Sequence, residues 1–558
     1  MKKLLLFAFV CSSAFAADNP ALPPKAALDS ITPDGLLKHI KVLASDEFEG
    51  RAPGSKGEEL SIKYIADQFK AVGLKPGNPD GTYLQEVPLA GITTEPTAHF
   101  SVNGNTVDLK FPDDYVASSA RLQDNINVSD SPIVFVGYGI VAPEFGWDDY
   151  KDVDVKGKTI LMLINDPPVV DPNTGELDRK MFGGRAMTYY GRWTYKYEIA
   201  AQKGAAAAVI IHETEPAAYP YSVVRTSWSK ENFEIDRPNK NMDQVEVRSW
   251  ITLDIAKKFL ADSGQDFDAL KQAAVTKGFR PVELNGATAT FDIKQQVRSF
   301  KSHNVVGKID GSDAKLKDEW VIYSAHWDHL GKHSELQGDQ IFNGAVDNAS
   351  GVAAVIELAK AYTKLPKPTK RSVLFMSTTA EEAGLLGAKY YAEHPLYPLE
   401  KTLADINIDE LNVWGKARDI EETSFGFTTL SDMLGEAAKT QNRTLVPNPR
   451  AEKGSIYRAD NFEFSKVGVP VLYIGPIEHL LSRAADAPLR SDEFDAHDYH
   501  QVSDEVHPDW DLSGAAQDVQ LLFDVGYDVA NGAKWPEWKA GNEFKPKRDE
   551  MLSRAKTR

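Results

Sequence analysis

The chain has 558 residues, of which 42% are hydrophobic and 26% are charged. This length suits several domains of about 150 residues each, and this composition excludes wholesale disorder. The formal net charge of −18 argues against a nucleic acid partner, because phosphate backbones select basic surfaces.

The first residues, "MKKLLLFAFVCSSAFAADNP", have the pattern of an export signal. Two lysines precede a short apolar run, and Ala14-Phe15-Ala16 supplies a small-x-small cleavage pattern, which predicts a secretory signal peptide over 1–16. The alternative is an N-terminal membrane anchor, but the apolar run is too short to span a bilayer. We therefore expect a periplasmic or secreted protein that is free of the membrane after cleavage behind Ala16.

The only cysteine of the chain, Cys11, lies inside this segment. After cleavage the protein would contain no disulfide, so its core must be large enough to be stable without one. A metal site in such a chain must be built from histidine and carboxylate side chains.

Residues 17–300 show two kinds of sequence pattern. Residues 17–85 contain helical spacing at 33–45 and 58–74, whereas 86–300 turn β-like and include an Asn103-Gly104 hairpin signal. Within that stretch, about 131–230 alternates strands with a helix and has His212 as its only histidine. We interpret 86–300 as an insertion that contains a small α/β domain.

Residues 301–540 have the most regular pattern of the chain. Apolar strands alternate with amphipathic helices, which predicts an α/β fold with a mixed, mostly parallel central sheet flanked by helices. The expected strands are 304–311, 319–329, 371–384, 402–412 and 469–475, and the expected helices are 348–365 and 385–395. The remaining 541–558 is a charged tail that we expect to form a solvated helix.

Acids and histidines recur in this region where strands end or helices begin. Parallel strands bring their carboxyl ends to one edge of a sheet, so these side chains should meet there. Two zinc ions in a co-catalytic site need one bridging carboxylate and further histidine or carboxylate ligands. The five residues that make up such a set are His326, Asp347, Glu382, Asp409 and His500.

Two further acids have expected roles beside these ligands. Asp328 is close enough in sequence to accept the second N–H of the His326 imidazole. Glu381 is the extra acid next to a ligand, and it can accept a proton from water. The other histidines of the region lack a comparable pattern and are expected on the surface or beside the site: His303, His329, His333, His394, His479, His497 and His507.

Each of these residues also has a plain structural interpretation. Asp347 suits a helix N-cap, Glu381-Glu382 suits the acidic first turn of a helix, and His500 suits an ordinary surface position. For any one residue alone the plain interpretation is favoured. Five such placements in one domain favour a metal site instead.

Five stretches in this order resemble the motifs of the M28 family of zinc peptidases: "SAHWDHLG", "GAVDNASGVAAVIELA", "STTAEEAGLLGAKYY", "INIDELN" and "YHQVSDEV". The resemblance covers 303–510, and about 131–230 is similar to a protease-associated (PA) domain. It implies peptide substrates, with His326 and Asp409 on one zinc, Glu382 and His500 on the other, and Asp347 bridging. It also implies that Glu381 is the general base and Asp328 the support of His326.

The sequence departs from that family at two places. Glu410 follows Asp409 and competes with it as a ligand. The stretch Ala459-Asp460-Asn461 replaces a usual Ser-Asp-His, which leaves Arg458 and Asp460 as expected residues of the substrate pocket.

Three alternatives to an aminopeptidase stay open at this stage. A carboxypeptidase would need an arginine for the terminal carboxylate, and Arg458, Arg483 and Arg490 are candidates. A single-zinc aminoacyl cyclase is disfavoured by the five ligands and the large insertion. A non-catalytic M28-like binding module would be expected to have lost ligands, and none is lost here.

Overall fold

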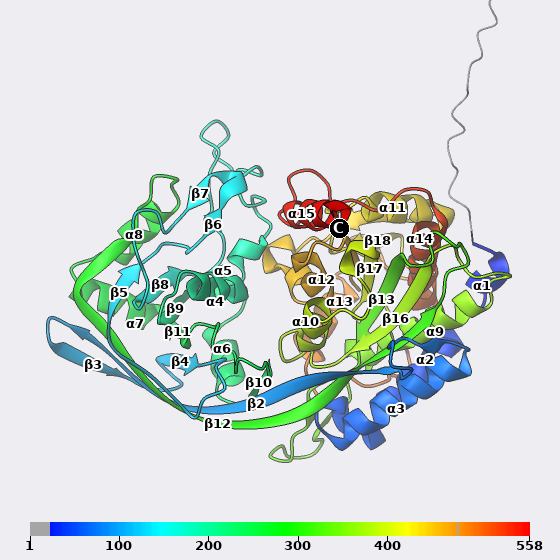
Figure 1. The fold of residues 1–558 in the computed structure, drawn as a ribbon, viewed down its shortest axis with the longest axis horizontal. Coiled ribbons are helices and arrows are strands. Elements are labelled where there is room, and N and C mark those ends of the chain that lie inside the picture. The colour runs from blue at the N-terminus through cyan, green and yellow to red at the C-terminus, as the bar shows by residue number, and fades with distance from the viewer. Residues whose placement is uncertain (1–22, 477–478, 558) are drawn as a thin grey trace, which may run out of the picture.

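Two long antiparallel strands connect the two parts of the molecule (Figure 1). The structure is a computed structural model and describes residues 23–476 and 479–557. Strands β2 (Leu84–Val102) and β12 (Val282–Ile309) pair from Val102↔Ala287 to Leu84↔Val305. We call the part formed by 103–281 the inserted unit, and the part formed by 23–83 with 310–557 the larger unit.

The sheet of the larger unit is mixed and mostly parallel, which confirms the expected fold class. Strand β13 (Trp320–His326) lies at its centre, parallel to β16 (Ser372–Thr378) on one side and to β17 (Thr402–Ile408) on the other. Beyond β17 follow β20 (Val471–Ile474), β18 (Asp419–Glu422) and β19 (Thr444–Pro447), and β12 lies antiparallel beside β16. Every residue of β13, β16 and β17 is buried, as expected of strands covered on both faces, and this includes the polar Asp405 and Asn407 of β17.

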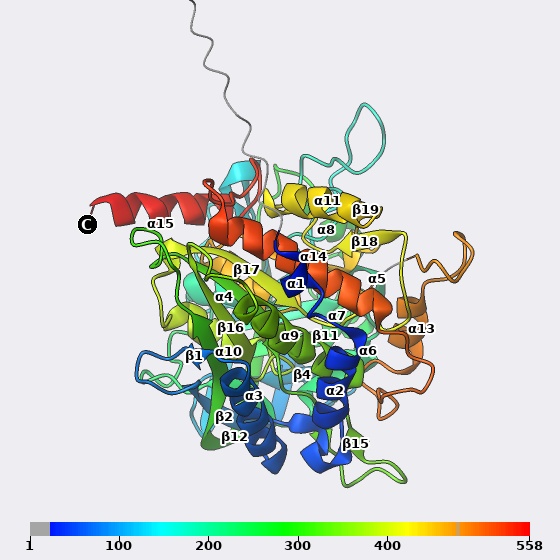
Figure 2. The ribbon, with the colours of Figure 1, turned by 90° about the vertical axis from the view of Figure 1, so that its right-hand side faces the viewer.

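Helices cover both faces of this sheet (Figure 2). Successive side chains of a strand point to opposite faces, so Val321 and Tyr323 join one hydrophobic cluster while Ile322 joins another. The first cluster contains residues from α2 (Pro33–Leu43), α3 (Lys56–Ala71), α9 (Gly351–Thr363), α11 (Leu430–Thr440), α13 (Arg490–His497) and α14 (Ser513–Asn531). The second contains residues from α10 (Leu386–Glu393) and α12 (Asn461–Lys466).

Two helix starts follow directly from their sequences. The Thr32 side chain accepts the Gly35 N–H ahead of Pro33 at the start of α2, and Ser55 accepts the Glu58 N–H at the start of α3. The remaining elements of this unit are α1 (Lys25–Leu28), β1 (Lys75–Pro76), β14 (Gly331–Lys332), β15 (Ile341–Phe342) and α15 (Lys545–Thr557), the last of which is the helix expected in the charged tail.

The inserted unit has its own hydrophobic core, and its strands continue the sheet of the larger unit through β12. Strands β5 (Asn125–Phe135), β8 (Thr159–Leu163), β9 (Ala207–His212) and β11 (Val247–Thr252) are parallel neighbours, and β4 (Tyr115–Ser118) closes the edge. The Asn103-Gly104 turn joins β2 to β3 (Asn105–Leu109), as the hairpin signal predicts. The other elements are β6 (Val141–Ala142), β7 (Trp147–Asp148), α4 (Trp193–Gln202), α5 (Thr214–Ala217), α6 (Tyr221–Trp228), β10 (Asn232–Ile235), α7 (Leu253–Asp262) and α8 (Phe267–Ala274).

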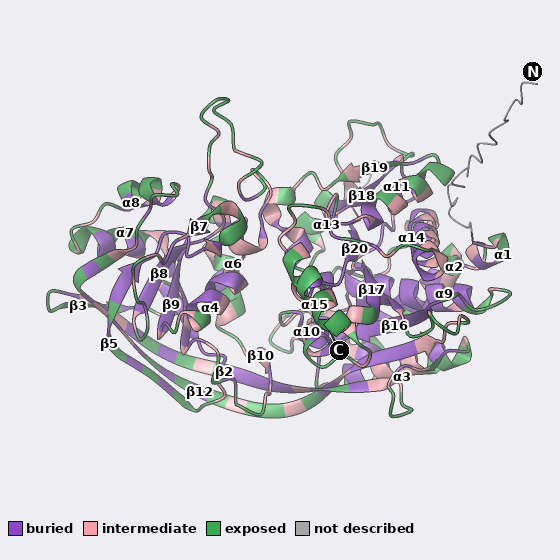
Figure 3. Cartoon of the chain, turned by 45° about the horizontal axis from the view of Figure 1, so that its top comes forward, coloured by how far each residue is buried: buried purple, intermediate pink, exposed green. Residues whose placement is uncertain are grey.

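The two connecting strands differ in burial between the units. Residues 296–301 of β12 contain no buried side chain (Figure 3), whereas Leu89 and Ile92 of β2, which pair with this stretch, are buried. The units also meet directly, away from this ribbon. The Met187 N–H donates to the Ala451 carbonyl over 3.2 Å, and Lys466 Nζ lies 2.7 Å from Glu198 Oε1.

A buried arginine donates to backbone carbonyl groups in three segments next to the carboxyl end of β13. The Arg51 guanidinium donates to the carbonyl oxygens of Leu43 (2.8 Å), Trp327 (2.9 Å) and Gly344 (2.8 Å), and to that of Asn343. Burial lowers its pKa to about 10, while nearby carboxylates act in the opposite direction. The segments around 327 and 344 are therefore held in register with the N-terminal helices.

We predict that Arg51→Met destabilises the larger unit strongly. Four buried carbonyl groups would lose their donor, and each unsatisfied group costs about 1–3 kcal/mol. Urea unfolding followed by tryptophan fluorescence should show a free energy of unfolding lower by at least about 3 kcal/mol. Arg225→Gln is the control, because its ion pair with Asp113 is exposed and should change stability by less than about 1 kcal/mol. Equal midpoints for both variants would contradict the tethering role of Arg51.

Candidate metal centre

Six chemically active side chains from distant parts of the sequence meet at the carboxyl edge of the central strands. His326 is the last residue of β13, Asp409 directly follows β17, and Glu381 and Glu382 follow β16. Because β17, β13 and β16 are neighbours in the sheet, these strand ends lie side by side. Asp347 enters from the helical turn Ala345–Ser350 ahead of α9, and His500 from the loop between α13 and α14.

Asp347 lies at the centre of the cluster. Its Oδ1 lies 3.3 Å from His326 Nε2, and its Oδ2 lies 3.2 Å from His500 Nε2. The two histidines thus face different oxygens of one carboxylate. An ion beside each histidine would have this carboxylate as a common neighbour.

Each histidine has a second carboxylate at the same distance. His326 Nε2 lies 3.1 Å from Asp409 Oδ1, and His500 Nε2 lies 3.1 Å from Glu382 Oε2. Zinc binds nitrogen and oxygen ligands at about 2 Å, so two ligands of one tetrahedral ion lie roughly 3 Å apart. The spacing within each half of the cluster is that of ligands around one ion.

The surroundings of the His500 side chain indicate whether a cation fits between it and the neighbouring carboxylates. Its Nε2 is buried and has two carboxylate oxygens nearby, yet it makes no hydrogen bond to a described residue. A buried nitrogen without a hydrogen bond is costly, and a bound cation would satisfy it. The donor set of imidazole nitrogens and carboxylate oxygens suits zinc.

Burial and charge shift the pKa values of the whole cluster. Burial raises the pKa of Glu381 well above its usual range, with the negative charges of Asp409 and Glu382 acting in the same direction. Burial alone would also raise the pKa of Glu382, but His500 and His329 hold it at about 2. The pKa of His500 is raised well above its usual value against the effect of burial, mainly by Glu382. Positive charge is therefore strongly favoured at the histidines.

Asp328 supports the site differently from what the sequence suggested. His326 Nδ1 lies 3.1 Å from the backbone carbonyl oxygen of Asp328, whereas the Asp328 carboxylate is 3.8 Å away. That carboxylate instead accepts the backbone N–H groups of Glu381 (3.0 Å) and Glu382 (3.4 Å). The expected carboxylate–imidazole hydrogen bond is replaced by a carbonyl–imidazole one, because the side chain of Asp328 is engaged by the loop after β16.

His329 also reaches this centre. Its fully buried ring places Nδ1 2.7 Å from Glu382 Oε1 and 3.9 Å from Asp347 Oδ2, and Nε2 has no hydrogen-bond partner among the described residues. His329, Asp347 and Glu382 form one of the two groups of potential ligands in the described residues, and His326, Glu381 and Asp409 form the other. The sequence feature that could have indicated His329 is its position directly after Asp328, in the same loop.

Asp504 is a second residue that the sequence interpretation did not single out. Its carboxylate is buried and accepts the backbone N–H groups of Val346 (2.9 Å) and Asp347 (3.1 Å). Burial raises the pKa of Asp504 to about 7. It follows His500 by four residues, so one loop contributes both a candidate ligand and the anchor of Asp347.

Of the two candidate acids behind β17, only Asp409 joins the cluster. Glu410 belongs to neither group of potential ligands in the described residues, and its backbone N–H donates to Asn348 Oδ1 over 3.2 Å. Asp460 is buried beside the centre and accepts the hydroxyl of Thr378, the last residue of β16. Arg458 is exposed, with its guanidinium 5.9 Å from the ring of Tyr219 in the inserted unit.

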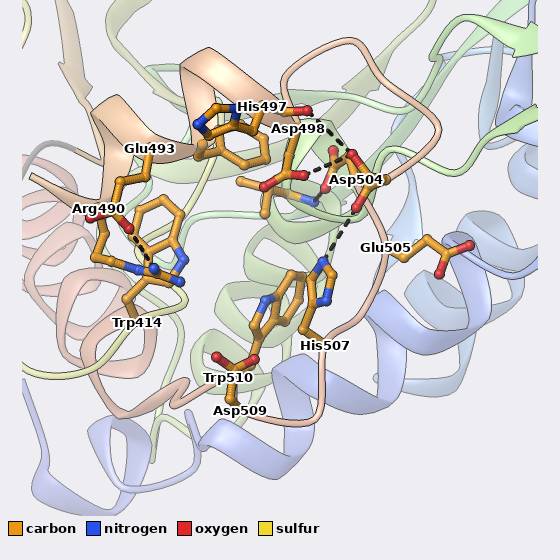
Figure 4. Close-up of a pocket in the computed structure, with 13 residues that line it drawn as sticks. Trp414, Arg490, Glu493, His497, Asp498, Asp504, Glu505, His507, Asp509 and Trp510 are labelled. Carbon is orange, nitrogen blue, oxygen red and sulfur yellow. Dashed lines mark hydrogen bonds and ion pairs between the residues drawn. The ribbon is translucent and has the colours of Figure 1, made fainter.

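The pocket in Figure 4 lies beside the centre. It has a volume of about 230 Å³, and its lining includes Val346 and Asp504 but none of the six converging side chains. His497 and His507, expected on the surface or near the site, belong to this lining. Arg490 also lines it and pairs with Glu493 at 2.5 Å, as Arg483 does at 3.2 Å.

Comparison with known proteins gives matches over part of the chain. "Vacuolar membrane protease" of Clavispora lusitaniae is 26% identical over 219 residues, which is 36% of this chain and 20% of that protein. "Aminopeptidase NAALADL1" of Mus musculus is 35% identical over 129 residues, which is 22% of this chain and 16% of that protein. The chain thus spans a fifth or less of the length of these relatives.

Among solved structures, an aminopeptidase from Aneurinibacillus sp. strain AM-1 is 18% identical, with a TM-score of 0.49 and coverage of 91% of this chain and 96% of that one. A zinc aminopeptidase from Bacillus subtilis is 16% identical, with a TM-score of 0.43 and coverage of 92% and 98%. Residues 304–523, which contain all six converging side chains, match the model of Peptidase family M28. This region of the chain belongs to peptidase family M28.

Proposed function

We propose that this protein is an exported zinc aminopeptidase with a co-catalytic pair of ions. The observation that carries the proposal is the position of Asp347, whose two oxygens face His326 and His500 separately at 3.3 and 3.2 Å. In this proposal His326 and Asp409 would hold one zinc, Glu382 and His500 would hold the other, and Asp347 would serve as a ligand common to both. Bound zinc would polarise the scissile carbonyl and acidify water.

Glu381 is the proposed general base. It lies within one group of potential ligands with His326 and Asp409, and burial raises its pKa well above that of a free carboxyl group. A carboxylate with a raised pKa accepts a proton near neutral pH and can return it to the leaving amine. The hydrogen bond from the Glu381 N–H to Asp328 fixes the backbone from which this side chain projects.

The charges around the centre support removal of N-terminal rather than C-terminal residues. The cluster contains several buried acids, which favour an ammonium group over a second carboxylate. Two of the arginines considered for a carboxypeptidase, Arg483 and Arg490, are both paired with Glu493. A non-catalytic binding module is the second interpretation, and the presence of every candidate ligand disfavours it.

The proposals on export and on the insertion rest on sequence patterns. The signal peptide over 1–16 lies outside the described residues. Within the described part of the chain, none of the helices combines the length and the apolar character needed to cross a membrane. We keep the PA-like assignment of about 131–230 as a proposal, and the inserted unit that contains it is an α/β structure around a parallel sheet.

We predict that the purified protein binds about two zinc ions per chain and that Asp347→Asn reduces both. The amide cannot bridge two cations as a carboxylate does, so both affinities should fall by at least about tenfold. Elemental analysis after dialysis measures the count, and chelation followed by zinc addition should abolish and restore hydrolysis. Asp67→Asn, at an exposed ion pair on α3, should keep the count. A single ion at saturating zinc would exclude the bridged pair.

We predict opposite effects for two adjacent substitutions. Glu381→Gln should keep the zinc content and lower kcat by at least about 100-fold, because the amide cannot accept the proton. Glu382→Gln should lower the affinity for one zinc ion, because one ligand oxygen with its charge is replaced. Zinc titration by calorimetry together with steady-state kinetics separates the two. Loss of zinc in the first variant and full zinc content in the second would reverse the roles of this pair.

We predict that a free amino group on the substrate is required. Leucine anilide should be hydrolysed, and N-acetyl-leucine anilide should not, because the acidic site stabilises the ammonium group that acetylation removes. Comparing kcat/KM for the two substrates measures the requirement. Equal cleavage of both, combined with a need for a free C-terminus, would indicate a carboxypeptidase.

A further inference from the structure

An acid without a partner stands next to the candidate centre. Glu410 directly follows Asp409, and its backbone N–H donates over 3.2 Å to the side chain of Asn348, the residue after Asp347. Its carboxylate makes no hydrogen bond or ion pair with the described residues, and it belongs to neither group of potential ligands found among them. The side chain is partly exposed, so it is accessible to a substrate at the centre.

The local backbone holds Glu410 in one orientation. Asn348 Nδ2 donates to the Ile408 carbonyl over 3.0 Å while Asn348 Oδ1 accepts the Glu410 N–H, so one amide clamps the chain on both sides of Asp409. The φ angle of Glu410 is 63°, in the left-handed region that residues other than glycine rarely adopt. Such conformations are costly and cluster at functional sites. The turn after β17 thus fixes Glu410 beside the centre but outside its ligand groups.

Tyr473 lies on the neighbouring strand and faces the same acids. In β20 it pairs with Asn407 of β17, two residues before Asp409, and paired residues of adjacent strands point to the same face of a sheet. Tyr473 is only 8% exposed, yet its hydroxyl makes no hydrogen bond with the described residues. Burial raises the pKa of this phenol well above its usual value, and the charges of Asp409, Glu410 and Glu421 act in the same direction.

Glu421 of β18 brings a second carboxylate to this face. Gly475 directly follows β20 and leaves the space that the carboxylate occupies, since a Cβ atom on Gly475 would lie 2.1 Å from Glu421 Oε2. Glu421 is fully buried, and among the described side chains only the Thr423 hydroxyl donates to it, over 3.2 Å. Burial raises the pKa of Glu421 to about 8.

Positive charge is scarce around these two acids. Neither Glu410 nor Glu421 forms an ion pair with a described lysine, arginine or histidine. Arg450 lowers the pKa of Glu421 against the larger effect of burial, but its guanidinium is already paired with Asp492 at 2.5 Å and Asp495 at 3.0 Å. Carboxylates in such surroundings are costly without a cation, which indicates a cation that comes from outside the chain.

We propose that Glu410, Glu421 and the hydroxyl of Tyr473 form a subsite for a cationic side chain on the N-terminal residue of the substrate. The ligand is the ammonium group of lysine or the guanidinium group of arginine. This inference rests on the proposed function and adds to it a substrate class, namely peptides whose first residue is basic.

The geometry favours a side chain over the α-ammonium group as the ligand. An α-ammonium group would stay next to the metal ligands, whereas Glu410 lies outside both ligand groups of the described residues. Lysine and arginine carry their charge at the end of a long apolar stem, and such stems pack along aromatic rings like that of Tyr473. Hydrogen bonds from these cations to carboxylates are about twice as strong as neutral ones.

The test compares lysine anilide with norleucine anilide, which has the same four-carbon stem without the charge, and arginine anilide with citrulline anilide. In the wild-type protein, kcat/KM should be at least about tenfold higher for the charged member of at least one pair. Glu410→Gln should lower that charged-to-neutral ratio by at least about tenfold, because the amide carries no charge. Glu410→Asp should keep part of the preference, and Tyr473→Phe should lower the ratio less than Glu410→Gln does.

Glu436→Gln is the matched control. It removes a negative charge from an exposed ion pair with Lys439 on α11 of the same unit, and it should leave the ratio at its wild-type value. A wild-type ratio near one for both pairs would overturn the subsite. An equal fall of kcat/KM for both members of a pair in Glu410→Gln would also overturn it, since the residue would then act on the α-ammonium group or on the fold.

Binding provides a readout that does not depend on turnover. Calorimetric Kd values for L-lysine and L-norleucine on the zinc-loaded protein should favour lysine, and Glu410→Gln and Glu421→Gln should each reduce that preference. If the wild-type protein hydrolyses none of the anilides, the proposed function fails. A Kd preference for lysine that Glu410→Gln removes would still support the subsite, and equal Kd values for the two amino acids would overturn it.

Discussion

The burial of several carboxylates around two histidines is the constraint on which the larger unit depends. Asp347, Glu382 and Asp409 lie within 3.3 Å of imidazole nitrogens in a region with little access to water. Carboxylates in such a place are costly unless positive charge accompanies them. In the protein alone the histidines can provide that charge by holding protons. The proposed zinc ions would replace those protons, so the same burial that disfavours the free acids favours metal binding.

The surrounding backbone is arranged to keep these acids in place. Asp504 accepts the N–H of Asp347, and Asp328 accepts the N–H groups behind β16. Arg51 ties the segments that flank β13 and Asp347 to the N-terminal helices. Backbone segments fixed in this way limit the rotamers of the acids that they carry, and a metal site needs that precision. The N-terminal helices are thus part of the site, although they contribute no candidate ligand.

The inserted unit is joined to the larger unit in more than one place. It is connected through β2 and β12, and it also touches the larger unit around Met187 and Glu198. Tyr219 of the inserted unit also lies near Arg458, whose guanidinium is 5.9 Å from its ring. The acids of the candidate centre all come from the larger unit, and the inserted unit contributes to the contacts between the two.

Much of the larger unit follows from local pattern. The runs that become β13, β16 and β17 are mostly apolar because both faces of a parallel sheet are covered, and candidate acids and a histidine lie at their ends. Parallel strands place such ends side by side, so the meeting of His326, Glu382 and Asp409 was predictable. The helices α2 and α3 carry their own capping residues, and the Asn103-Gly104 turn fixes its own hairpin. In these cases the information lies within a few residues of the element.

Only the tertiary structure decided which groups pair across long separations. Arg51 finds acceptors 8 to 293 residues away, and nothing near it in sequence marks them. The Asp328 carboxylate was expected on His326 but binds backbone N–H groups more than 50 residues away, which the folded chain brings next to it. The burial of His329 against Glu382 is a pairing of the same kind. Sequence by itself determined the elements and the residues at their ends, since hydrophobic period and capping are local. The partners of buried charges depended on the packing of whole units, since burial and distance exist only in the folded chain.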